Sequence, residues 1–191
     1  MKKLMFICLV FLSANCFGQG LLQRLSFGVK AGANYSNFTN ADFATDGLVG
    51  FHAGALVNFR IAGGFSVQEE FLFSSQGAKM KEDVFGKENI KVYYMSVPFL
   101  LKYRTKPGIY IEAGPQASFR IKDDIGKTDI GEFTKKMDLA AVGGIGYQSP
   151  IGLGFGARYV YGISKVGDFQ LSDVKPDFKN SVVQASIFYI F

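Results

Sequence analysis

Residues 49–61 read VGFHAGALVNFRI, and their apolar and polar side chains alternate with a period of two. The odd positions hold only apolar residues, from Val49 and Phe51 to Phe59 and Ile61. The even positions hold glycine, histidine, asparagine and arginine around a single leucine. Because successive side chains of a β-strand point to opposite faces of a sheet, the stretch predicts a strand that is apolar on one face and polar on the other.

Seven further stretches show the same alternation, at residues 26–35, 66–76, 93–103, 109–120, 138–147, 153–162 and 183–191. Each is close to the roughly 9–11 residues that a tilted transmembrane strand needs. Short links (62–64, 104–108, 148–152) alternate with long polar links (37–47, 77–89, 122–136, 164–180). Outer-membrane barrels combine an even number of strands with short periplasmic turns and long outer loops. We therefore predict an all-β fold, an eight-stranded antiparallel up-and-down transmembrane β-barrel with both termini in the periplasm.

The polar faces of these stretches collect nearly balanced acidic and basic side chains, together with most of the glycines. The predicted polar network of the lumen consists of Lys30, His52, Arg60, Glu70, Lys102, Glu112, Asp138 and Arg158. An eight-stranded barrel is just wide enough for side chains to fill, so these groups are expected to pair across a narrow lumen. The alternative is a soluble lipocalin-like barrel or a β-sandwich, but those folds place the apolar face inside. The charged face therefore favours a barrel whose apolar face contacts lipid. Tyrosines near strand ends are expected at the membrane interfaces, namely Tyr35, Tyr93, Tyr103, Tyr147 and Tyr189.

The composition excludes several other classes of protein. Of the 191 residues, 15% are aromatic and 19% are charged, which rules out a disordered chain because such chains have few aromatic residues and much charge. Lys and Arg are scattered along the chain, so no basic stripe can follow nucleic-acid phosphates and no nucleic-acid partner is expected. The uncharged run 139–157 is long enough for a transmembrane helix, but it is rich in glycine and is interrupted at residues 148–150. This run is interpreted as two strands and a turn.

The first residues match a secretory signal peptide. Lys2 and Lys3 precede an apolar run that ends at Leu12, and small and polar residues follow, as in the charged, apolar and cleavage regions of such signals. We predict a signal peptide over residues 1–18, cleaved after Gly18, and a barrel domain over residues 19–191. A lipoprotein signal, with Cys16 as the lipidated residue, is the alternative. Cleavage removes both cysteines, so no disulfide is expected in the exported protein.

Five short motifs lie in order along almost the whole predicted barrel domain. They are EFLFSSQG at residues 70–77, YMSVPFLLKY at 94–103, EAGP at 112–115, GGIGY at 143–147 and ARYVYG at 157–162. Together they resemble the PorT-like family of outer-membrane β-barrels, and this resemblance implies an outer-membrane barrel. It implies little about function, because most of that family is uncharacterised. The C-terminal Phe191 ends an alternating strand, which is typical of the signal that the barrel-assembly machinery recognises.

These features predict an integral protein of the bacterial outer membrane whose structural, adhesive or partner-docking role lies in its long outer loops. Its expected partners are outer-membrane lipids, the barrel-assembly machinery and an unidentified protein at the loops. A small-solute pore is the first alternative, and it requires that the lumen side chains leave a path for water. A lipid-modifying enzyme is the second, in which His52 would act with Ser66 or Ser74 and with Glu70. Nothing in the pattern fixes such a geometry, so no catalytic residue, cofactor or metal site is predicted.

Overall fold

The structure is a computed structural model, and it describes residues 23–39, 45–80, 89–124, 137–164 and 179–191. Within these ranges the chain forms eight β-strands: β1 (Leu25–Thr39), β2 (Thr45–Ala62), β3 (Phe65–Met80), β4 (Asn89–Arg104), β5 (Ile109–Asp124), β6 (Met137–Gln148), β7 (Leu153–Gly162) and β8 (Lys179–Ile190). The predicted signal peptide, residues 1–18, and the central parts of the four long links lie outside the described residues.

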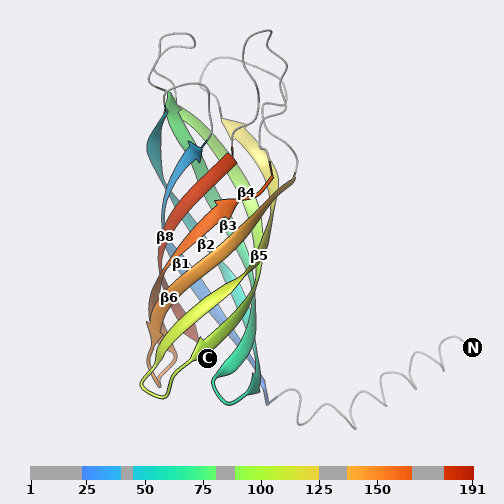
Figure 1. Ribbon diagram of the computed structural model, residues 1–191, viewed down its shortest axis with the longest axis vertical. Coiled ribbons are helices and arrows are strands. Elements are labelled where there is room, and N and C mark those ends of the chain that lie inside the picture. The colour runs from blue at the N-terminus through green and yellow to red at the C-terminus, as the bar shows by residue number, and fades with distance from the viewer. Residues whose placement is uncertain (1–22, 40–44, 81–88, 125–136, 165–178) are drawn as a thin grey trace, which may run out of the picture.

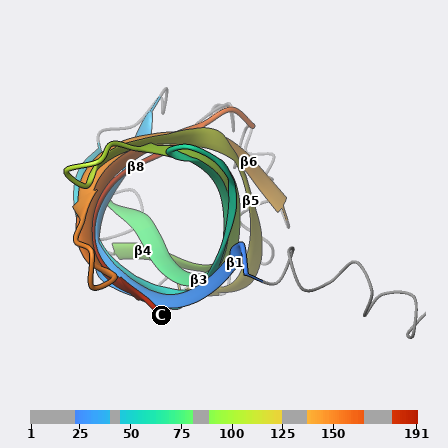
Figure 2. The same ribbon diagram turned by 90° about the horizontal axis from the view of Figure 1, so that it is seen from below.

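The strands pair in sequence order, each antiparallel to its neighbours, and β1 pairs with β8 to close the ring. Figure 1 shows the strands tilted relative to the long axis, and Figure 2 shows the closed ring from one end. Closure leaves no free sheet edge, so the backbone N–H and C=O groups of the wall can be paired within the wall, as a lipid environment demands. The predicted eight-stranded antiparallel barrel is confirmed.

The alternation in the sequence decides which side chains face outward. Large apolar side chains at odd positions are exposed on the outer wall, for example Phe27 (53%), Phe51 (52%) and Ile187 (57%). Side chains at even positions of the same strands are mostly buried inside the barrel. Tyr103 and Tyr189 are exposed close to the ends of β4 and β8, where interface tyrosines were predicted. The outer surface is therefore the apolar band that contact with lipid requires.

Three tight turns connect the strands at the end of the barrel where the C-terminus lies (Figure 1), at residues 63–64, 105–108 and 149–152. Gly63, Gly108 and Gly152 have φ angles of 56°, 105° and 92°. L side chains rarely adopt this backbone conformation, whereas glycine does so without strain. The three short links predicted from the sequence are confirmed as turns, and glycine is what allows them to be this short.

Most strands are longer than the sequence pattern predicts. β2 has 18 residues and β3, β4 and β5 have 16 each, whereas β6, β7 and β8 have 10 to 12. Most of the extra residues lie at the end away from the tight turns, in or next to segments predicted as loops. The ladder continues there because inward side chains still find partners. The Ser36 hydroxyl donates to the Gly77 carbonyl oxygen and accepts from the Gly77 N–H, both at 2.8 Å.

The run 139–157 forms most of β6 and the first half of β7, joined by the turn at residues 149–152, as predicted. Across the described ranges, the chain contains no helix with the length and hydrophobicity needed to cross a membrane.

Two apolar clusters lie inside the barrel, where the sequence pattern predicted a polar lumen. The first cluster contains Leu100, Ala140, Val142, Val160 and Val182. The second contains Leu56, Tyr110 and Phe188. All of these residues occupy even positions, so their inward direction was predictable. Their apolar character follows from the narrowness of the barrel, in which an inward position is also a packed core position.

Candidate functional site

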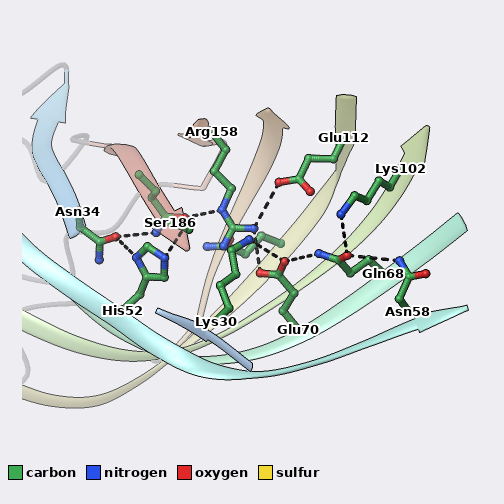
Figure 3. A network of polar contacts seen from close by, with 12 residues as sticks. Lys30, Asn34, His52, Asn58, Gln68, Glu70, Lys102, Glu112, Arg158 and Ser186 are labelled. Atoms are coloured by element: carbon green, nitrogen blue, oxygen red, sulfur yellow. Dashed lines mark hydrogen bonds and ion pairs between the residues drawn. The ribbon is translucent and has the colours of Figure 1, made fainter. Parts of the chain in front are cut away.

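Glu70 on β3 is the centre of a polar network inside the barrel (Figure 3). Its Oε1 accepts hydrogen bonds from Lys30 Nζ at 2.9 Å and from Gln68 Nε2 at 2.7 Å, and its Oε2 accepts one from Arg158 Nη1 at 2.9 Å. Glu70 is fully buried, and Lys30 and Arg158 are each 4% exposed. Lys30 comes from β1 and Arg158 from β7, so the ion pairs join strands that are not neighbours in the wall. Because each charge would be costly without its partner, the three groups depend on one another.

Amide and imidazole groups continue the network from Arg158. Arg158 Nε donates to Gln184 Oε1 at 2.6 Å, and Gln184 Nε2 donates to Asn34 Oδ1 at 2.9 Å. The same oxygen of Asn34 lies 2.7 Å from His52 Nδ1, and His52 Nε2 lies 2.9 Å from Ser186 Oγ. These contacts connect β7, β8, β1 and β2. The polar network therefore ties together side chains from most of the circumference of the barrel (Figure 3).

The amide of Asn34 determines the tautomer of His52. Asn34 Nδ2 donates to two backbone carbonyl oxygens at 3.0 Å, so its Oδ1 faces the imidazole. An amide oxygen can only accept, so His52 Nδ1 carries the hydrogen and Nε2 accepts from the Ser186 hydroxyl. This is the order of groups that activates a nucleophilic serine. However, Ser186 pairs with Gly32 on one side and Gly156 on the other, so its flanking backbone belongs to the strand ladder and is poorly placed to stabilise an oxyanion.

The serines predicted as partners of His52 in the enzyme alternative have other partners. The Ser74 hydroxyl oxygen accepts a hydrogen bond from Asn34 Nδ2 at 3.0 Å, and the Ser66 hydroxyl oxygen accepts one from Asn58 Nδ2 at 3.1 Å. The contacts of the Glu70 carboxylate are with Lys30, Gln68 and Arg158. The groups of that alternative therefore point to different partners and do not form a triad.

Lys102 closes the network toward the tight-turn end of the barrel. Its Nζ donates to Gln68 Oε1 at 3.3 Å and lies 3.9 Å from the centre of the Tyr110 ring and 4.7 Å from that of Phe188. A cation is attracted to the face of an aromatic ring by the ring quadrupole. Lys102, Tyr110, Phe188 and Leu56 are all at most 4% exposed. We call these four residues the aromatic layer, because together they pack across the lumen below the charged network.

Glu112 is held less firmly than Glu70. Its Oε1 lies 3.9 Å from Arg158 Nη1, and among the described residues its Oε2 and Arg158 Nη2 have no hydrogen-bond partner. Glu112 is directly opposite Lys102 in the β4–β5 pair. It therefore balances the positive charge of the lumen without the close hydrogen bonds that fix Glu70.

Two residues of the predicted network lie apart from it. Arg60 is near the end of β2, is exposed, and lines a pocket at the tight-turn end. Asp138 is near the opposite end of the barrel, at the start of β6, and accepts a hydrogen bond from the Ser164 hydroxyl. Alternation predicts the face of a residue but not its height along the barrel, which is why these two were grouped with the rest. The other six predicted residues come together: Lys30, His52, Glu70, Lys102, Glu112 and Arg158.

Asn34 and Ser186 belong to the network but were not predicted as members. Both occupy even positions of predicted strands, so their phase in the alternation was the available signal. Their importance comes from hydrogen bonds across the lumen, which the pattern of one strand does not contain. In the part of the chain that the structure describes, no three His, Cys, Asp or Glu side chains are grouped so that they could hold a metal ion.

Comparisons with known proteins agree with this architecture. Residues 15–168 match the model of a family described as outer membrane protein beta-barrel domain. Among solved structures, Neisserial surface protein A (NspA) is similar with a TM-score of 0.56 and 17% identity, over 86% of this chain and 97% of that chain. Ail, the attachment invasion locus protein of Yersinia pestis, in complex with the heparin analogue sucrose octasulfate, has a TM-score of 0.53 and 17% identity, over 88% and 99%.

OprG from Pseudomonas aeruginosa is similar with a TM-score of 0.50 and 15% identity, over 87% of this chain and 95% of that chain. At such identities these likenesses show the fold alone. No curated protein sequence matches the chain.

Proposed function

The chain belongs to the outer membrane protein β-barrel domain family, and on this basis we propose that it is a non-conducting barrel of the bacterial outer membrane that acts through its long connections. In this proposal the tight turns and both termini face the periplasm. The four connections at the other end face outward, where they attach the cell to a surface or dock a partner protein. Export by residues 1–18, assembly through Phe191 and membership of the PorT-like group are parts of the same proposal.

The observation that supports this function most strongly is the filled interior. Glu70 and its partners occupy the middle of the barrel, and the aromatic layer packs across the lumen beside them. Side chains buried to this degree favour a plugged barrel over a pore. Because the lumen of a plugged barrel is closed, its two rims are the surfaces that contact soluble molecules. Binding residues in proteins are concentrated in loops, such as the long connections at one rim.

The names of two similar proteins support attachment by analogy. NspA is named a surface protein, and Ail is named an attachment invasion locus protein and was crystallised with a heparin analogue. A shared fold does not by itself imply a shared function. The two names therefore bear only on the choice between a structural and an adhesive role, and they favour adhesion.

We also propose that the chain is not an enzyme. The Ser186–His52–Asn34 order inside the barrel is the strongest argument for catalysis. However, Asn34 is equally a structural partner, because its amide also bonds to Gln184 and Ser74. A hydrogen-bonded lumen histidine explains all of these contacts without a substrate.

Photo-crosslinking in intact cells tests the attachment role and the orientation together. A crosslinking amino acid at position 128, between β5 and β6, is expected to capture an external protein or surface component. The same amino acid at position 106, in the tight turn between β4 and β5, is the matched control and is expected to capture no external component. Crosslinks to external components from position 106 would contradict the proposal. The absence of such crosslinks from both positions would contradict it as well.

A further inference from the structure

A pocket of about 470 Å³ occupies the mouth of the barrel at the tight-turn end. We call it the basic vestibule. Its lining comes from β1, β2, β3 and β4 and from the ends of β6 and β8, so it spans the mouth rather than one side of the wall. Figure 2 views the barrel from this end. The vestibule is at the opposite end from the long connections, so a ligand bound in it would be independent of any molecule that those connections bind.

The lining of the basic vestibule carries positive charge only. Arg60, Lys102, Arg104 and Lys106 line it, and none of the lining residues is acidic. Several cations gathered around one cavity repel one another, so the arrangement favours an anion between them.

Within the described residues, these four cations form no close ion pair with a carboxylate side chain. The ion pairs of the charged network involve Lys30 and Arg158, and none of the four vestibule cations takes part in them. Lys102 is 1% exposed, and its Nζ has a neutral amide oxygen and two aromatic rings as close partners. Glu112 is directly opposite Lys102 in the β4–β5 pair and offsets part of its charge, so the attraction for an anion comes mainly from Arg60, Arg104 and Lys106.

We propose that the basic vestibule binds a phosphate group, carried either by a phospholipid headgroup or by a soluble phosphate ester. Arginine presents a planar set of N–H donors that matches phosphate oxygens, and Arg60 and Arg104 supply two such sets. Ser26 and Ser66 add hydroxyl groups to the lining. A phosphate group has four oxygen atoms, so it can accept hydrogen bonds from donors on several sides of the mouth at once.

The outer edge of the vestibule is suited to a lipid. Phe65 and Tyr103 line the pocket and are also exposed on the apolar outer wall, with ring centres 4.7 Å apart. A phospholipid could therefore place its phosphate in the vestibule while its acyl chains lie against these rings. In the proposed orientation this end lies at the inner leaflet, whereas a soluble phosphate ester would enter from the periplasm.

Binding is measured by calorimetry on the full-length barrel folded in a nonionic detergent, with glycerol phosphate and short-chain phosphatidylglycerol as probes. We expect saturable binding that weakens as the salt concentration rises, because the contacts are ionic. Equal affinity for both probes identifies a soluble phosphate site. Phosphatidylglycerol binding at least about tenfold tighter, with the excess lost in Phe65→Ser, identifies a lipid site, since apolar burial adds affinity only for the lipid.

The variants Arg60→Gln and Arg104→Gln are each expected to weaken binding about tenfold, because a hydrogen bond to a charged group is worth at least that factor. The double variant is expected to show no saturable binding. Lys91→Gln is the matched control, because it removes one cation at the opposite end of β4, and it should leave the affinity unchanged. A heat-dependent shift on SDS gels verifies that each variant is folded. Absence of saturable binding of both probes to the wild type, or full affinity in the double variant, would overturn the proposal.

Discussion

Glu69 and Glu70 are adjacent in sequence and face opposite sides of the barrel wall. Glu70 is fully buried between Lys30 and Arg158 in the lumen. Glu69 is at an odd position on the outer side and is paired across the sheet with Val57 and Phe99. Successive strand residues point to opposite faces, so two identical carboxylates one residue apart occupy different environments. Comparing them separates the effect of the lumen from the effect of a lost negative charge.

Glu70→Gln is expected to lower the free energy of unfolding by about 3–5 kcal/mol, because it leaves Lys30 and Arg158 as buried cations without their carboxylate. The measurement is equilibrium unfolding in guanidinium with the barrel reconstituted in phospholipid vesicles. Glu69→Gln is the control and is expected to change the unfolding free energy by no more than about 0.5 kcal/mol. Equal stabilities of the two variants would show that the lumen ion pairs do not stabilise the barrel.

The faces of these residues were predictable from the sequence, whereas their partners were not. Alternation places Lys30 and Glu70 on the polar face of their strands. Their contact also requires β1 and β3, which are not neighbours in the wall, to bring these positions to the same height. That height depends on the tilt and stagger of the strands, which is a property of the closed barrel. Arg60 is the opposite case, because its side chain is on the predicted polar face but lies at the mouth of the barrel and not in the Glu70 network.

At the scale of strands, two glycines make room for the largest side chain of the aromatic layer. Tyr110 on β5 lies over Gly146 on β6 and Gly156 on β7. A Cβ at Gly156 would overlap the Tyr110 hydroxyl oxygen, while the Tyr110 Cζ and the Ile145 carbonyl oxygen would be 3.2 Å away. A Cβ at Gly146 would overlap the Phe155 carbonyl oxygen as well as Tyr110. The phase of these glycines in the strands is therefore set by packing inside the lumen.

Gly156→Ala is expected to lower the free energy of unfolding by about 1–3 kcal/mol, as for other overpacked cores. Tyr110→Phe removes the atom that the new methyl group overlaps, so the double variant is expected to recover most of this loss. Unfolding in guanidinium measures both effects.

Gly146→Ala is the control for this rescue. Its overlap with a backbone carbonyl oxygen remains when the hydroxyl is removed, so Tyr110→Phe should restore little of its stability. Equal rescue at the two positions, or no rescue at Gly156, would contradict the packing argument.

Strand number and strand phase were predictable, but strand length was not. The sequence pattern ends β3 at residue 76, and the structure continues it to Met80. The alternation of apolar and polar residues weakens where the outer face no longer has to be apolar. The alternating stretch therefore marks only the part of a strand that contacts lipid. The ladder itself extends further, because polar contacts such as those of Ser36 with Gly77 hold the strands together beyond that part. The wall of β2 to β5 is therefore longer than a membrane crossing alone requires.

At the scale of the whole molecule, two different kinds of packing obstruct the lumen in series. The aromatic layer lies toward the tight-turn end, and the network centred on Glu70 adjoins it through Gln68. The first obstruction is mainly apolar and the second is charged. An ion that entered the basic vestibule would meet the buried Lys102 and its aromatic partners before it reached the Glu70 carboxylate. A cation would be repelled there, and an anion would have to displace packed rings.

The wild-type barrel is therefore expected to show no stable unitary conductance in planar lipid bilayers, for either cations or anions. A porin reconstituted in the same bilayer is the control that conduction can be detected. Current steps of constant size that depend on the folded protein would show that water passes the aromatic layer and the Glu70 network, and would favour the small-solute pore. If no current steps are observed although the protein inserts normally, as verified by the heat-dependent gel shift, the two rims are the places where this barrel acts. In that case the basic vestibule and the long connections would be separate sites on the two sides of one membrane, with a packed lumen between them.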